Sequence, residues 1–234
     1  MRTWGWQRWI AVIGLLFVVQ QVVLVAIALS AGVPPGPAEE AKLADYVTKN
    51  SGTLLAAIFV SDIGLALYLI FASGLRSVLR LAADYEWAAA LFFGSALVVI
   101  ALNGASLALS GAAAIDTGGK VNPASVRALW DAGLVVAWMT TFPLAISIGT
   151  VAYATARSRV LPGWTVWVGY VAAFLTALYS FTIFGGSDPS NLFSINGLAG
   201  LLLGLLPVLV WVVCVSVAIW RLPANAVGRM RAPA

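Results

Sequence analysis

The sequence contains no histidine and only one cysteine, and these absences exclude several kinds of chemistry. Without histidine there is no histidine-ligated haem, no histidine-bound zinc and no Ser-His-Asp triad. The lone thiol of Cys214 cannot form an intrachain disulfide. The lysines (Lys42, Lys49 and Lys120) fall in predicted loops, which excludes a Schiff base inside a span. We therefore expect no enzyme, no catalytic residue, no metal and no cofactor.

Charge is also scarce, and this decides the class of protein. Only 9% of the 234 residues are charged and 62% are hydrophobic, with a mean hydropathy of +0.97. A soluble domain carries roughly 25% charged residues, so this chain lacks the polar surface to dissolve in water. The net charge of +4 is not arranged as a basic stripe, so we do not expect nucleic-acid binding. The main partner is the lipid bilayer.

The apolar residues form runs long enough to cross a bilayer, which takes about 20 residues per helix. The first run is longer than the apolar region of a signal peptide, so we expect it to stay uncleaved although Ala28-Leu29-Ser30 is similar to a cleavage site. The sequence therefore predicts an all-α, polytopic transmembrane helical bundle of six spans that forms one domain over residues 1–234. The predicted spans are residues 10–31, 53–75, 87–110, 131–156, 164–184 and 194–220.

The basic residues predict the orientation of this bundle. Nine arginines fall at one set of span ends: Arg2, Arg8, Arg76, Arg80, Arg157, Arg159, Arg221, Arg229 and Arg231. Four basic residues fall at the other set: Lys42, Lys49, Lys120 and Arg127. Lys and Arg concentrate on the cytoplasmic side of membrane proteins. Both termini are therefore expected in the cytoplasm.

Three local signals predict details of the helices. Asn122 followed by Pro123 is typical of a helix start. Pro143 falls within the fourth span and should kink it. In the first outer loop, residues 38–50 predict either a short amphipathic helix on the membrane surface, with Leu43 and Val47 on one face, or a solvated loop.

Asp62 is the one charged residue deep inside an apolar run, nine residues from the outer end of its span. At 1.5 Å per residue this places the carboxylate about 13 Å into a core of about 30 Å. Neutral polar residues are expected at similar depths, and together they predict an outer-half polar cavity centred on Asp62. These residues are Gln20, Gln21, Asn103, Thr140, Thr141 and Tyr179.

An ionisable group at this depth is a functional hypothesis by default. The leading hypothesis is transport or binding of a small solute, an ion or a proton through that cavity. One alternative is that Asp62 and its neighbours only hold helices together by hydrogen bonds. Another is a non-transporting sensor, scaffold or subunit that binds a membrane-protein partner or forms a homo-oligomer.

The turn into the fifth span reads Arg159-Val-Leu-Pro162-Gly-Trp164-Thr-Val-Trp167-Val-Gly169. This basic, Leu-Pro and double-tryptophan pattern resembles a large bacterial family of six-span proteins known only as a domain of unknown function. The resemblance implies a multi-pass protein of the bacterial inner membrane and assigns no site residues.

Overall fold

A computed structural model describes residues 5–80, 85–115, 122–195 and 197–222. Arg2, Lys120, Arg229 and Arg231, which entered the charge count, lie outside the described residues. Within them the chain is helical, and six helices are long and apolar enough to cross a membrane. They are α1 (Trp6–Ala31), α3 (Ser51–Leu79), α4 (Glu86–Ile115), α5 (Pro123–Trp138) continued by α6 (Thr141–Ser158), α7 (Trp164–Tyr179) continued by the 3-10 helix η3 (Ser180–Gly185), and the π-helical η4 (Gly200–Leu205) continued by α8 (Leu206–Trp220).

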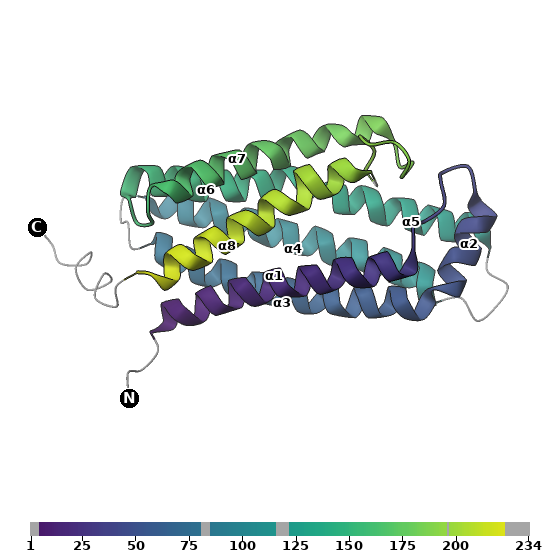
Figure 1. Ribbon diagram of the computed structural model, residues 1–234, viewed down its shortest axis with the longest axis horizontal. Coiled ribbons are helices and arrows are strands. Elements are labelled where there is room, and N and C mark those ends of the chain that lie inside the picture. Colours follow the sequence, from purple (N-terminus) through teal and green to yellow (C-terminus); the bar gives the residue numbers. More distant parts are fainter. Residues whose placement is uncertain (1–4, 81–84, 116–121, 196, 223–234) are drawn as a thin grey trace, which may run out of the picture.

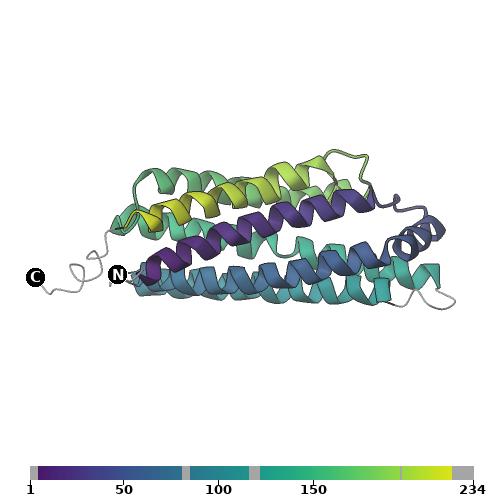
Figure 2. The same cartoon turned by 60° about the horizontal axis from the view of Figure 1, so that its bottom comes forward.

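The spans run lengthwise beside one another (Figure 1), and their contacts close a ring in the order of the sequence. Each span packs on the next, and α8 returns to pack on α1, which lies between α8 and α3 (Figure 2). The start of α1 and the end of α8 share one end of the bundle, which we call the terminal end (Figure 1). The opposite end carries the short helix α2 (Glu40–Lys49) and is called the α2 end.

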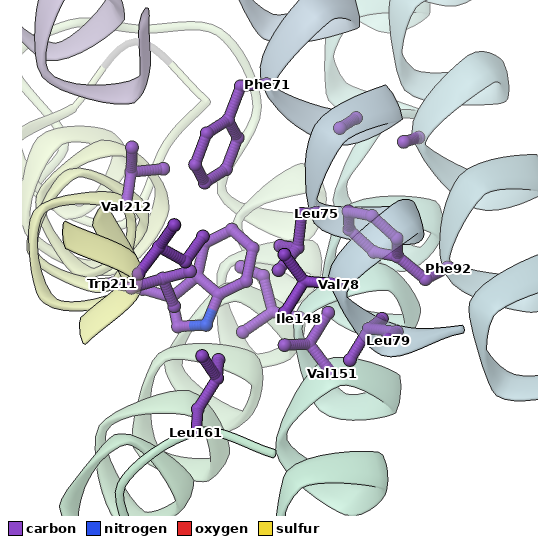
Figure 3. Packing of buried hydrophobic residues seen from close by; sticks show 14 of the residues in the cluster. Phe71, Leu75, Val78, Leu79, Phe92, Ile148, Val151, Leu161, Trp211 and Val212 are labelled. Carbon is purple, nitrogen blue, oxygen red and sulfur yellow. The ribbon is translucent and has the colours of Figure 1, made fainter. Parts of the chain in front are cut away.

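A tightly packed apolar core fills the terminal half of the ring (Figure 3). Trp211 of α8 is completely buried, and its ring meets Phe71 of α3 edge-on at 6.3 Å. Leu75, Phe92 and Ile148 bring α3, α4 and α6 into the same cluster. All six spans contribute to this cluster, the fourth span through α6 only, so the terminal half is where the spans are held together by close packing.

Close approach of α1 to its neighbours depends on Gly14. A Cβ atom at this position would collide with the Ser216 hydroxyl of α8 and lie 2.8 Å from the Phe71 ring of α3. The glycine therefore lets three helices meet with their backbones close together, as small residues do in membrane bundles.

The predicted amphipathic helix is present as α2, but it packs against protein. Leu43 and Val47 are buried against Val126 of α5 and the end of α4. The ring of Tyr46 meets Trp130 edge-on at 6.2 Å. The alternative of a solvated loop is therefore wrong, because α5 extends far enough to receive the apolar face of a helix. The location of α2 at the membrane surface stays a prediction.

The start of the fourth span agrees with the sequence signal. Asn122 precedes Pro123, and its side-chain oxygen accepts a hydrogen bond of 3.1 Å from the Ala124 N–H. The helix therefore begins eight residues before the predicted residue 131, because the early polar turns of α5 pack on α2 and do not need to be apolar.

The sixth span begins later than the predicted residue 194, because residues 186–195 and 197 are not helical. Asp188 accepts hydrogen bonds from the N–H and the hydroxyl of Ser190, and Asn191 donates to the Gly185 carbonyl. Side chains of this kind compete with a helix for backbone partners. The two hydrogen bonds from Ser190 also lower the pKa of the Asp188 carboxyl.

Candidate functional site

A cavity of about 320 Å³ occupies the centre of the ring between the apolar core and the α2 end. All six spans contribute to its wall, which is mostly apolar. Its polar lining residues are Gln21, Ser61, Tyr68, Asn103, Thr140, Thr141, Thr176 and Tyr179. Among the described residues that line it there is no Asp, Glu, Lys or Arg. Such a volume is within the range of small-molecule sites.

Two of the spans are irregular where they border this cavity. The fourth span breaks between α5 and α6, at Met139 and Thr140. Pro143 explains the break, because it has no N–H for the Met139 carbonyl and its ring would clash there. Pro207 has the same effect on Leu203, where the sixth span adopts the π-helical turn of η4. Irregular backbone at membrane depth is tolerated where it is buried in protein or lines a cavity.

Several polar groups in the wall are already satisfied by neighbouring atoms. The Thr140 hydroxyl donates to the Ala137 carbonyl at 2.6 Å, which covers one carbonyl at the helix break. The Ser180 hydroxyl donates to the Thr141 hydroxyl at 2.8 Å, which leaves the Thr141 proton to donate elsewhere. The Tyr179 hydroxyl donates to the Ile195 carbonyl at 3.2 Å and so ties α7 to the loop before η4.

Two hydroxyls of the wall have no partner. Tyr68 of α3 is 3% exposed and Thr176 of α7 is 1% exposed, and neither hydroxyl makes a hydrogen bond. The Ser147 hydroxyl lies beside Tyr68 but does not reach hydrogen-bonding geometry. Both residues line the cavity, and a buried polar group without a partner costs about 1–3 kcal/mol. The two hydroxyl oxygens are themselves closed off, so a ligand reaches them only when the side chains shift.

The structure brings most of the predicted site residues to this cavity. Gln21, Asn103, Thr140, Thr141 and Tyr179 all line it. The Asn103 amide donates to the Val99 carbonyl of its own helix at 3.0 Å, so its side-chain oxygen is available to a ligand.

Gln20 lies behind the wall and acts between helices. Its amide donates to the Val60 carbonyl of α3 at 3.0 Å, and its side-chain oxygen is buried without a partner. Gly64 leaves the room for this amide, since a Cβ atom there would collide with it. Gln20 therefore fits the alternative hypothesis, in which a polar residue only holds two helices together by a hydrogen bond.

Asp62 does not line the cavity. It lies on the exposed face of α3, whereas Gly64, Tyr68 and Phe71 form the buried face. Its neighbour Ser61 does reach the wall, but the Ser61 hydroxyl donates to the Ala57 carbonyl at 2.8 Å. The expectation that the cavity is centred on Asp62 therefore differs from the structure, because α3 turns its aromatic and glycine-bearing face inward.

Tyr68 and Thr176 were not among the predicted site residues. Both are polar residues within apolar runs, which is one signal that could have identified them. Tyr68 follows Gly64 by four residues and so shares its face. A glycine on this face permits close packing of a neighbouring helix, and the tyrosine beside it places a hydroxyl there. The two residues together indicate a helix face that points into the bundle.

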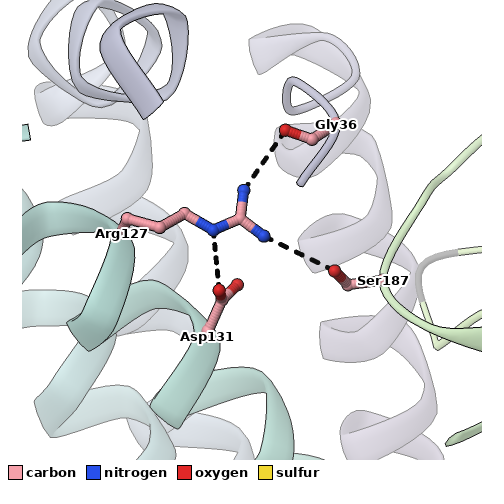
Figure 4. A network of polar contacts seen from close by, with 4 residues as sticks. All are labelled: Gly36, Arg127, Asp131 and Ser187. Atoms are coloured by element: carbon pink, nitrogen blue, oxygen red, sulfur yellow. Dashed lines mark hydrogen bonds and ion pairs between the residues drawn. The ribbon is translucent and has the colours of Figure 1, made fainter. Parts of the chain in front are cut away.

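A second polar site lies at the α2 end, around Arg127 (Figure 4). The buried guanidinium donates to Asp131 at 2.6 Å and to the Gly36 carbonyl at 3.2 Å, and its remaining arm points to the Ser187 hydroxyl at 3.5 Å. The Arg127–Asp131 pair, whose members are four residues apart on α5, thus also joins the loop after α1 and the loop before η4. This arrangement braces three segments of the α2 end.

Comparisons with protein-family models, with curated proteins and with solved structures found no match. The resemblance of the turn at residues 159–169 to a bacterial family therefore stays a prediction. The chain is an all-helical protein with six helices that are long and apolar enough to span a membrane.

Proposed function

We propose that this protein binds a small, uncharged and mainly apolar molecule in its central cavity, through a hydrogen-bonding group on that molecule. The observation that carries the proposal is the pair of buried, unpartnered hydroxyls on Tyr68 and Thr176. The apolar wall favours an apolar ligand. The absence of charged residues among the described lining disfavours an ion or a charged solute.

The broken helices support this proposal. In many transporters, substrates bind near the membrane midplane where interrupted helices present free backbone groups. Here the α5–α6 break and η4 both border the cavity. The packed core below the cavity supports binding from the α2 end, since Phe71, Leu75 and Trp211 leave no room on the terminal side.

The proposed orientation places the terminal end in the cytoplasm of a bacterium, with the protein in the inner membrane. Described arginines gather at the terminal end, where Arg80 pairs with Glu86 at 2.9 Å and Arg8 stacks on Trp220 at 5.6 Å. Trp164 and Trp167 are exposed there, as expected at a membrane interface. The cavity then faces the outer half of the bilayer.

Binding of 1-naphthol and naphthalene, which differ by one hydroxyl, tests this function. The purified protein in lipid nanodiscs should bind 1-naphthol more tightly, and Tyr68→Phe should weaken that binding about fivefold, the worth of one hydrogen bond of about 1 kcal/mol. Binding of naphthalene should not change in Tyr68→Phe. Thr176→Val removes the other hydroxyl, and it too should weaken binding of 1-naphthol and leave binding of naphthalene unchanged.

Leu198→Ala provides a matched control, because Leu198 is exposed and does not line the cavity. Equal binding of both probes to wild type, or an equal loss of both in Tyr68→Phe, would contradict a role for the hydroxyls. Absence of measurable binding of either probe to a folded wild-type protein would count against the cavity as a ligand site.

Cysteine labelling reports access to the cavity separately. In a Cys214→Ala background, a cysteine in place of Asn103 should react with a small water-soluble thiol reagent, because Asn103 lines the cavity. A cysteine in place of the buried Ser216 should not react, because that residue lies against Gly14 in the packed half. Saturation with 1-naphthol should slow labelling at position 103 severalfold, and no protection would place the probe elsewhere.

A further inference from the structure

The carboxylate of Asp62 is presented to the outside of the bundle at membrane depth. It follows the start of α3 at Ser51 by eleven residues, about 17 Å along the helix. On the other side, the nearest basic residue of α3 is Arg76, fourteen residues or about 21 Å away. Asp62 has no hydrogen bond or ion pair within the described residues.

The surface around Asp62 is apolar and exposed. Phe59 is 67% exposed, and Ile63 and Leu69 are partly exposed on the same side of α3. Residues three, four or seven apart share a helix face, so Phe59, Asp62, Ala66 and Leu69 form one stripe. We call this stripe the Asp62 face.

The neighbouring helix α4 offers room for close approach. Leu65 of α3 lies against Gly104 of α4, which fixes the relative depth of the two helices. At this depth α4 exposes the small residues Ala101, Ala105 and Ala108. Small residues on exposed helix faces let another transmembrane helix come near.

Lipid tails do not satisfy a carboxylate, and ionisable residues within spans are normally paired. A second copy of this chain does not bring a cation to this depth, because its basic residues lie at span ends or in loops. Two copies packed through this face would oppose carboxylate to carboxylate. A cation that pairs with Asp62 at this depth would therefore come from a different molecule.

We propose that the Asp62 face docks a transmembrane helix of a different protein, and that this helix carries a lysine or arginine near the membrane midplane. The Asp62 carboxylate accepts a charge-assisted hydrogen bond from that cation, and Phe59, Ala66 and Leu69 pack against the flanking apolar residues of the helix. This inference does not depend on the cavity, which is lined by Ser61, Leu65 and Tyr68 on another face of α3.

Association with a designed helix in lipid vesicles tests the proposal. The probe is a Leu/Ala-rich peptide of about 22 residues with one central lysine, and its control carries methionine at that position. The protein is labelled in a Cys214→Ala background through a cysteine in place of Ser125, an exposed residue at the α2 end. Energy transfer between protein and peptide measures binding.

The lysine peptide should bind about tenfold more tightly than the methionine peptide, as expected for one charge-assisted contact. Asp62→Asn should remove the difference, and Asp45→Asn, which changes an exposed carboxylate of α2, should not. Asp62→Lys should restore binding to a peptide with a central aspartate, which keeps the test valid if one variant folds poorly.

Equal binding of the lysine and methionine peptides to wild type would overturn the proposal. Self-association of the wild-type protein that disappears in Asp62→Asn would also overturn it, because the occupant of the Asp62 face would then be a second copy.

Discussion

Trp211→Ala is expected to lower the free energy of unfolding by about 3 kcal/mol. Trp211 of α8 is completely buried in the terminal half of the ring, where it meets Phe71 of α3 and lies beside Gly169 of α7. In a membrane protein the unfolded reference is still apolar, so the loss comes from the unfilled space and the missing dispersion contacts with Phe71 and its neighbours. Reversible unfolding in mixed micelles, followed by helix content, measures the change.

Trp167→Ala is the matched control for this substitution. Trp167 is 74% exposed on α7, so its removal leaves no internal space, and the change should stay within about 0.5 kcal/mol. Similar losses in the two variants would mean that tryptophan stabilises this protein through lipid contact, and that the packed core in Figure 3 does not set the stability.

Arg127→Leu is expected to lower the free energy of unfolding by about 2 kcal/mol. Breaking a fully buried ion pair would cost more, but the Asp131 side chain is 42% exposed. The substitution leaves the Asp131 carboxylate without its cation, and one of its oxygens is already buried without a partner. It also releases the Gly36 carbonyl and the Ser187 hydroxyl. Hydrogen exchange should therefore accelerate in residues 33–39 and 186–195, while the terminal half keeps its protection.

Arg127→Lys should recover only part of this loss, because an ammonium group lacks the planar fork that reaches three partners. Arg80→Leu is the control, since the Arg80–Glu86 pair is exposed on both sides and should contribute less than about 1 kcal/mol. Unchanged exchange in the two loops of Arg127→Leu would show that other contacts hold them in place.

Much of the fold follows from the sequence because lipid imposes simple rules on it. A span needs a long apolar run, so the number of spans could be predicted by locating such runs in the sequence. The Asn122-Pro123 start and the break caused by Pro143 are local backbone effects, so they too could be predicted. The start of the sixth span could not, because side chains such as Asp188 hold the preceding residues in a non-helical loop.

The direction in which each span faces could not be predicted. In a soluble helix apolar residues mark the buried face, but a membrane helix is apolar on both sides. The depth of Asp62 could be calculated, whereas its outward position depends on which face of α3 packs on α1 and α4. Gln21, Asn103 and Thr141 line the cavity because the helix faces that carry them turn inward. No feature of the neighbouring sequence predicts that orientation.

The break between α5 and α6 makes the two ends of the molecule mechanically unequal. Between Trp138 and Thr141 the regular helix is interrupted, so α5 can tilt without bending α6. α5 packs mainly on α2 and α4, whereas α6 packs on α4 and α7 beside the filled core. We therefore expect the two ends to differ in stiffness, with α5 and α2 moving relative to the filled core when the volume of the cavity changes.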